Sequence, residues 1–201
     1  MNTLGPGDAL LVVDVQLDFM PGGALGVTGG DAVVAPLNRL VDLCVARGLP
    51  VVMSRDWHPP GHCSFHDRGG PWPVHCVAGS AGAGFHPGLH RPVDAIEIHK
   101  ATEPDRDAYS AFQGTGLAER LAALRVRRLV IGGLATDYCV RETVRDALAA
   151  GYDVVVLRDA VRAVDAHPGD GARALAEIEA RGAALLDSAE LASAAGAAER
   201  A

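Results

Sequence analysis

Apolar and polar positions along the chain follow two patterns, and each pattern predicts a different kind of element. Short, nearly continuous apolar runs predict strands of a parallel sheet that is covered on both faces. These runs span residues 9–13, 50–53, 95–98, 128–131, 152–157 and 183–186. Segments with helical periodicity lie between them, at 31–47, 115–124, 137–149 and 168–181.

Residues that start or stop helices mark the boundaries of these segments. Asp31 can cap the first helix and Gly48 can end it, while Gly151 and Gly182 can end the last two. Strands that alternate with helices predict a three-layer α/β/α domain around a mostly parallel six-stranded sheet, with right-handed crossovers. We assign residues 1–187 to this single domain, and we expect the small and polar residues 188–201 to form a frayed tail.

Composition narrows the classes of protein. The chain has 201 residues, of which 49% are hydrophobic and 21% are charged, as in ordinary soluble domains. The net charge is -7 without a basic block, so neither nucleic acid nor a membrane is an expected partner. Asp14 interrupts the first apolar run, which therefore predicts neither a signal peptide nor a membrane span. Four dispersed cysteines favour a reducing compartment, so we expect a cytoplasmic protein.

Two long segments interrupt the alternation of strands and helices. Residues 55–92 are rich in Gly and Pro and contain six of the eight histidines, and residues 101–114 form a polar loop with Tyr109 and Phe112. Long loops in compact domains are usually functional or disordered. We therefore expect these segments to carry ligands or substrate contacts.

Three chemically useful side chains follow three different strands. Asp14 closes the first strand, Lys100 follows the third, and Cys139 comes after the fourth, at the opening turn of a helix. A helix N-terminus favours a thiolate, and backbone N–H groups there, such as those of Ala135 and Cys139, can form an oxyanion hole. A lysine between an acid and a thiol would keep the acid ionised and stabilise the thiolate. Taken singly, each has a plainer interpretation: a capping Asp, a surface Lys and a buried Cys.

A second group of residues has the chemistry of a metal site. Asp56 and His58 are alternate residues at a strand end, so their side chains share a face, and His75 follows later in the loop. One carboxylate and two imidazoles suit a catalytic zinc, iron or manganese ion, with water, His62 or Ser64 as a fourth ligand. The alternatives are a solvent-exposed His-rich loop and a structural site that uses Cys63 and Cys76.

These motifs together resemble the nicotinamidase/pyrazinamidase branch of the isochorismatase-like cysteine hydrolases. The resemblance extends from about residue 9 to 186 in the family's order: VDVQLDF, RDWHPPGHCSF, GGPWPVHCVAGSAGAGFHP, HKA, DAYSAF and GLATDYCVRET. It implies an isochorismatase-like fold and deamidation of nicotinamide to nicotinic acid and ammonia through a cysteine thioester. It also implies pyrazinamide as a related substrate, a role in pyridine nucleotide salvage, and a divalent metal, zinc first, that orients the pyridine ring.

The resemblance also assigns roles to individual residues. Asp14, Lys100 and Cys139 match the catalytic triad, and Asp56, His58 and His75 match the metal ligands, with His62 as a candidate fourth. It implies aromatic contacts to the substrate from Phe19, Trp72 and Tyr109, a role for Gln16 at the metal site through a water, and a cis peptide between Leu134 and Ala135. The residue at position 138 differs among relatives.

Other functions fit parts of this pattern. A related hydrolase acting on an N-carbamoyl or ureido substrate would need the Asp, Lys and Cys but not the full set of metal ligands. A non-catalytic scaffold would not need a thiol at a helix start, and a thiol–disulfide role would favour a nearby second cysteine. The expected partner is a small-molecule substrate, and self-association into a homo-oligomer is compatible with the sequence.

Overall fold

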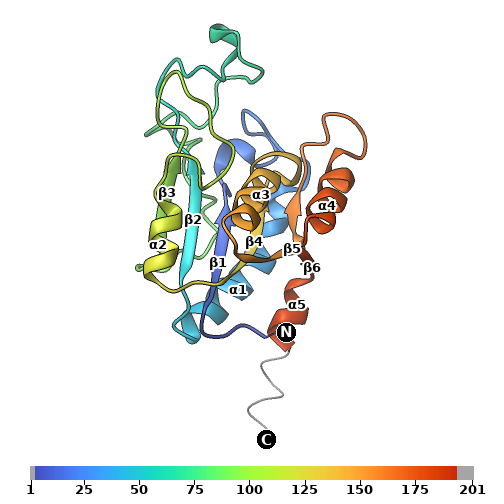
Figure 1. The fold of residues 1–201 in the computed structure, drawn as a ribbon. Coiled ribbons are helices and arrows are strands. Elements are labelled where there is room, and N and C mark those ends of the chain that lie inside the picture. The colour runs from blue at the N-terminus through green and yellow to red at the C-terminus, as the bar shows by residue number, and fades with distance from the viewer. Residues whose placement is uncertain (1–2, 194–201) are drawn as a thin grey trace, which may run out of the picture.

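Six strands form one sheet in which each neighbouring pair runs parallel (Figure 1). The computed structural model describes residues 3–193. The strand order is β3-β2-β1-β4-β5-β6. The strands are β1 (Asp8–Val13), β2 (Val51–Asp56), β3 (Ile96–Lys100), β4 (Arg128–Leu134), β5 (Asp153–Arg162) and β6 (Ala184–Leu186). The predicted six-stranded α/β sheet is confirmed, and it is parallel throughout.

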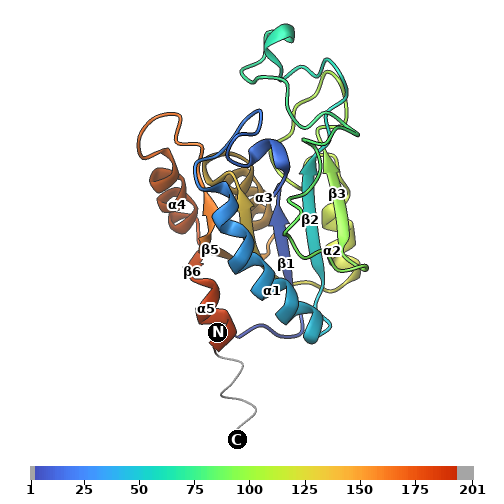
Figure 2. The same ribbon diagram turned by 180° about the vertical axis from the view of Figure 1, so that it is seen from behind.

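Helices cover both faces of the sheet and complete the three layers (Figures 1 and 2). One face carries α1 (Val34–Ala46) and α5 (Ser188–Ser193). The opposite face carries α2 (Leu117–Ala123), α3 (Arg141–Ala149) and α4 (Asp170–Ala180). Shorter helical turns are η1 (Leu17–Phe19), η2 (Gly30–Val33), η3 (His66–Arg68) and η4 (Thr136–Val140). No helix among the described residues combines the length and hydrophobicity needed to cross a membrane.

The central strand β1 shows why its sequence is apolar without interruption. Its side chains alternate between two buried layers: Leu10 and Val12 join the core with α1, whereas Leu11 and Val13 join the core with α2, α3 and α4. All four are fully buried. Because both faces are covered, a polar residue on either face of this strand would lose water without gaining a partner.

The structure corrects the expectations for two helices. Asp31 does not cap the first helix with its side chain, because it lies inside η2, where its carbonyl accepts the N–H of Val34. The segment 137–149 is not one α-helix, because it begins as the π-helical turn η4 and continues as α3. Single π-helical turns occur frequently at functional sites.

The expectation of a frayed tail from residue 188 is wrong for residues 188–193. They form α5, and Leu191 is fully buried in the core beside α1. The Ser188 N–H donates to Asp159 Oδ1 at 2.8 Å and starts this helix. Leu191 therefore supplies an apolar contact and Ser188 a polar contact that dock this segment. Residues 194–201 lie outside the described part of the chain.

The carboxyl ends of the strands define the edge where a site can form. The chain order reverses between β1 and β4, which are neighbours in the sheet. Open α/β sheets bind ligands at such a point, because the loops diverge there and leave a crevice. The segment 101–116 and the first part of segment 57–95 lie over this edge, at the top of Figure 1, whereas the end of segment 57–95 passes α1 and returns to the start of β3. The two irregular segments of the sequence therefore both reach the position expected for function.

Gly133 lets β4 pass close to β1 at this edge. Its φ is 129°, and a Cβ at this position would lie 2.0 Å from the carbonyl oxygen of Val13. The pairing of β4 with β5 shifts register between Ile131 and Gly133. A side chain at Gly133 would therefore push apart the two strands whose ends carry Asp14 and Cys139.

We predict that Gly133→Ala lowers the free energy of unfolding by about 3 kcal/mol or more, because it adds a backbone clash to a strained φ. Gly151→Ala is the matched control, since Gly151 also has a positive φ of 87° but its Cβ would meet nothing within 4 Å. The control should cost only about 1 kcal/mol. Urea unfolding of both variants measures the difference, and equal losses would contradict the steric explanation.

Candidate active site and metal centre

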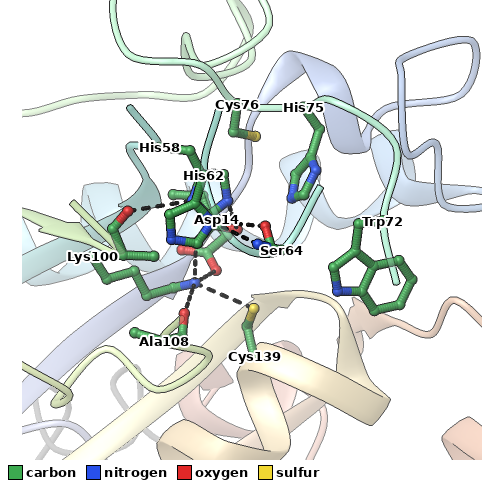
Figure 3. Close-up of polar contacts among 12 residues, drawn as sticks. Asp14, His58, His62, Ser64, Trp72, His75, Cys76, Lys100, Ala108 and Cys139 are labelled. Atoms are coloured by element: carbon green, nitrogen blue, oxygen red, sulfur yellow. Dashed lines mark hydrogen bonds and ion pairs between the residues drawn. The ribbon is translucent and has the colours of Figure 1, made fainter. Parts of the chain in front are cut away.

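The three predicted catalytic side chains converge at the carboxyl edge of the sheet (Figure 3). Asp14 follows β1, Lys100 ends β3, and Cys139 lies in η4 directly after β4. Lys100 Nζ lies 3.0 Å from Asp14 Oδ2 and donates to Cys139 Sγ at 3.4 Å. The structure thus places an ammonium between an acid and a thiol, as the sequence predicts.

Lys100 has a second carboxylate partner that the sequence does not predict. Its ammonium also donates to Asp56 Oδ1, and more weakly to the carbonyl of Ala108 at 3.3 Å. Asp56 and Lys100 are register partners on β2 and β3, which fixes this pairing. Lys100 is the only lysine in the sequence. A compact ammonium suits this position better than a planar guanidinium, because its partners approach from several directions.

Burial sets the direction of the pKa shifts in this cluster. Burial raises the pKa of Asp14, and the charge of Lys100 only partly offsets it. Burial also raises the pKa of the Cys139 thiol well above its ordinary value, against the opposing effect of Lys100. Burial disfavours the charged form of Lys100, but Asp14 and Asp56 hold its pKa well above the ordinary value. The sequence argument that Lys100 keeps Asp14 ionised therefore underestimates the cost of removing the carboxylate from water.

The three predicted metal ligands also come together. Asp56, His58 and His75 are buried, and each offers a ligand atom within 4.8 Å of the others. His58 Nε2 is buried without a hydrogen-bond partner, whereas its Nδ1 lies 3.3 Å from the Ala101 carbonyl. His75 Nδ1 lies 2.8 Å from the Pro73 carbonyl. A carbonyl on Nδ1 leaves Nε2 as the lone-pair donor, which is how imidazoles are prepared for a metal.

The charges of these ligands also suit a cation. Burial lowers the pKa of His75, which favours the neutral imidazole that binds metals. Burial opposes ionisation of Asp56, yet Lys100 and His58 hold the pKa of Asp56 below its ordinary value. An unpartnered nitrogen, a neutral imidazole and a carboxylate fit a divalent ion such as zinc.

His62 is not brought into this cluster as a fourth ligand. Its ring stacks on His58 with centroids 4.3 Å apart, and its nitrogens lie 2.8 Å from Ser64 Oγ and 3.2 Å from the Arg106 carbonyl. Because both nitrogens have protein partners, His62 supports the His58 ring instead. Among residues 3–193, Cys63 and Cys76 join no group of candidate metal ligands, which removes the structural-site alternative.

Two polar side chains hold the segments that carry the ligands, and their geometry is visible only in the structure. Gln16 Nε2 donates to the Asp56 carbonyl at 2.9 Å, and Gln16 Oε1 accepts the Asp56 N–H at 2.8 Å. Gln16 therefore holds the main chain of Asp56 directly. Asp18 Oδ2 accepts the N–H of Cys76 at 2.7 Å, which anchors the residue after His75. The sequence signal for both residues is that Gln16 and Asp18 are alternate polar residues in the segment VDVQLDF, just after β1.

A small cavity joins the thiol to the candidate metal ligands. The predicted aromatic residues Phe19, Trp72 and Tyr109 line it, and Trp72 Nε1 donates to the Tyr109 hydroxyl at 2.9 Å. The remaining lining residues are Leu25, Asp56, His75, Ala135, Tyr138, Cys139 and Val164. The lining is mostly aromatic and aliphatic with a few polar groups, which is the composition expected of a small-molecule site.

Tyr138, a position that the resemblance singled out, and Val164, which the sequence did not identify, also line the cavity. The Tyr138 ring packs edge-on against Trp72 with centroids 5.0 Å apart. Val164 is held over the cavity because its N–H donates to Asp137 Oδ1 at 3.0 Å, and the next N–H donates to Asp137 Oδ2 at 2.9 Å. Tyr138 directly precedes Cys139 in the sequence, and this position was the available signal for it. Val164 is near Cys139 only in space, so no local pattern identified it.

The segment before the nucleophile has the geometry expected from the resemblance. The peptide between Leu134 and Ala135 is cis. The Ala135 carbonyl accepts the N–H groups of Tyr138 and Val140, both at 3.1 Å. Those two donors are thereby committed to the turn. The N–H groups of Ala135 and Cys139 remain the proposed donors to an oxyanion.

Comparison with known proteins agrees with this site. The chain is 44% identical over 201 residues to a nicotinamidase of Escherichia coli (strain K12), covering 90% of this chain and 94% of that protein. The zinc complex of Pyrococcus horikoshii pyrazinamidase superposes with a TM-score of 0.87 at 49% identity, covering 90% and 99% of the two chains. A structure from L. infantum in complex with nicotinate gives a TM-score of 0.85 at 38% identity, covering 95% and 98%.

Residues 8–190 match the Isochorismatase domain, a range that contains each of the site residues described above. With this match over most of its length, the chain belongs to the isochorismatase domain family.

Proposed function

We propose that this chain is a metal-dependent amidohydrolase that converts nicotinamide to nicotinic acid and ammonia. One observation carries the proposal: the thiol of Cys139, which accepts from the ammonium of Lys100, lines a small aromatic cavity together with the carboxylate of Asp56 and the imidazole of His75, two groups suited to a metal. The relatives named nicotinamidase and the neighbouring structures with zinc and with nicotinate support the same substrate class. Pyrazinamide is a second expected substrate, since a pyrazinamidase is among these neighbours.

Asp56, His58 and His75 would hold the divalent ion, with zinc as the first choice. When bound, the ion would supply positive charge beside the catalytic group and a Lewis-acid site for a ring nitrogen. Phe19, Trp72 and Tyr109 line the cavity and would stack around the ring. These aromatic walls exclude water and fix the carboxamide near Cys139.

The proposed reaction begins with proton transfer from Cys139 to Asp14. Both pKa values are raised by burial, so the acid is a stronger base than an exposed Asp and is better matched to the thiol. The thiolate then attacks the carboxamide carbon, and the N–H groups of Ala135 and Cys139 hold the oxyanion. Lys100 stays charged and balances the negative charge that moves between the acid and the sulfur.

Three further proton transfers by Asp14 complete the cycle. Asp14 first returns its proton to the leaving nitrogen, which departs as ammonia and leaves a thioester on Cys139. Asp14 then accepts a proton from a water that attacks the thioester carbon, and it passes this proton to the sulfur as the C–S bond breaks. The products are nicotinic acid and the free thiol, so one amide and one water give one acid and one ammonia.

We expect Cys139→Ala to reduce nicotinamide turnover by several orders of magnitude while nicotinamide still binds, because the cavity is kept and only the nucleophile is lost. An ammonia-release assay measures turnover, and calorimetry measures binding. Cys44→Ala is the control, since Cys44 is a buried cysteine in the core beside α1, and it should keep full turnover. Substantial ammonia release by Cys139→Ala would remove cysteine from the nucleophile role.

We expect His58→Ala to weaken zinc binding by at least about a hundredfold and to raise the KM for nicotinamide, because one of three protein ligands is lost. Elemental analysis and zinc titration measure the metal, and circular dichroism checks the fold. His90→Ala removes an exposed histidine of the same long loop and should bind zinc normally. Full zinc content in His58→Ala would show that the ligands lie elsewhere.

We expect Lys100→Met to lower kcat by about a hundred- to a thousandfold, because two buried carboxylates and the thiolate lose their common cation. Arg128→Met removes a different partly buried cation, one that pairs with Asp8, and should reduce stability but keep kcat. Kinetics and urea unfolding of both variants separate the two effects. If both variants lose stability and neither loses kcat, Lys100 has only a structural role.

A further inference from the structure

Ser54 is a fully buried serine on β2 that contacts Asp14 at two points. Its hydroxyl donates to Asp14 Oδ1 at 2.7 Å, and its carbonyl accepts the Asp14 N–H at 3.1 Å. Ser54 is the register partner of Val13, the last residue of β1. One residue of β2 therefore holds both the main chain and the side chain of the acid.

The contact from the Ser54 hydroxyl matters because Asp14 lies beyond the end of the regular strand. Its φ is 49°, in the left-handed region, so the sheet no longer dictates where its side chain points. The two carboxylate oxygens have different surroundings. Oδ1 accepts the Ser54 hydroxyl, whereas Oδ2 lies 3.0 Å from Lys100 Nζ and is buried without a hydrogen bond. The hydroxyl thus fixes the plane of the carboxylate, with one oxygen on Ser54 and the other on the side of Lys100 and Cys139.

Lys100 does not by itself fix the plane of the Asp14 carboxylate, because its ammonium has several partners. Asp14, Asp56 and Cys139 each place a ligand atom within 4.8 Å of the others, so the region around Oδ2 is crowded with acidic groups. Lys100 is shared among all three. Without the Ser54 hydroxyl, the carboxylate plane could turn about the Cβ–Cγ bond so that both oxygens approach Lys100, and neither oxygen would then face the sulfur as it does in the structure.

We propose that Ser54 is a positioning residue that orients Asp14 so that Oδ2 receives the proton of the Cys139 thiol. This inference rests on the proposed hydrolysis, because orientation of a base matters only where a proton is transferred. Ser54 acts through Asp14 and does not line the cavity. A purely structural Ser54 would affect stability without a selective effect on the chemical step.

The test compares Ser54→Ala, Ser54→Thr and Ser54→Val in the full-length, zinc-loaded protein. Thr and Val have nearly the same shape and differ in the hydroxyl, so they decide the question even if Ser54→Ala fails to fold. Ser188→Ala is the matched control, because Ser188 is also a buried serine that donates to a carboxylate, Asp159 Oδ2 at 2.5 Å, at the start of α5 and outside the cavity.

Two measurements are made on each variant. Steady-state kinetics with nicotinamide give kcat and KM, and mass spectrometry of the Cys139 peptide gives the rate of alkylation by iodoacetamide. We expect Ser54→Ala and Ser54→Val to lower kcat about ten- to a hundredfold with little change in KM, and to slow alkylation of Cys139. Ser54→Thr should recover most of both rates, and Ser188→Ala should change neither.

The two measurements separate failure of this inference from failure of the proposed function. Wild-type rates in Ser54→Ala and Ser54→Val, or equal losses in Ser54→Thr and Ser54→Val, would overturn the positioning role. If the wild-type protein releases no ammonia from nicotinamide, the proposed function fails. The alkylation rates still decide whether Ser54 orients the acid toward the thiol, because alkylation needs no substrate.

Discussion

The site depends on one buried ammonium that is shared by two buried carboxylates and a thiol. The side chains of Lys100 and Asp14 are fully buried, and that of Asp56 is nearly so. Removing one partner from such a group typically costs about 3–5 kcal/mol, because a buried charge is left uncompensated. The carboxyl ends of β1, β2 and β3, which carry these residues, must therefore lie level with one another in the sheet. The electrostatics of the site and the register of the sheet impose the same geometry.

Asp56 connects the nucleophile to the candidate metal centre. Its Oδ1 accepts from Lys100, and its Oδ2 lies 3.7 Å from His58 Nε2. One carboxylate thus contributes an oxygen to each centre, so positive charge on one side changes the electrostatics on the other. The long segment after β2 is held against this residue by Gln16, which bonds to both main-chain groups of Asp56. Asp56 therefore both anchors the segment after β2 and takes part in the charge balance of the site.

The sequence indicated the residues of the site but not all of their relations. Asp14, Lys100 and Cys139 could be predicted because each follows an apolar strand, and parallel strands bring their carboxyl ends to one edge. The Asp56–Lys100 pair was missed because the register between β2 and β3 is set by packing, which leaves no local pattern. The contacts of His62, the candidate fourth ligand, could not be predicted for a related reason. Its spacing suits a ligand, but tertiary contacts with Ser64 and Arg106 occupy its nitrogens.

The amino-acid sequence by itself determined the layers of this protein and the set of reactive side chains. Hydrophobic periodicity is a local property of the sequence. A strand that is buried on both faces of a parallel sheet must be apolar at nearly every position, so its pattern is easy to recognise. Only the tertiary structure decided how the charges are shared, where the π-helical turn places Cys139, and which oxygen of Asp14 accepts the Ser54 hydroxyl. Those features arise from contacts between residues about 40 positions apart, such as Ser54 and Asp14. Such contacts exist only once the strands have paired, so no pattern in the sequence records them.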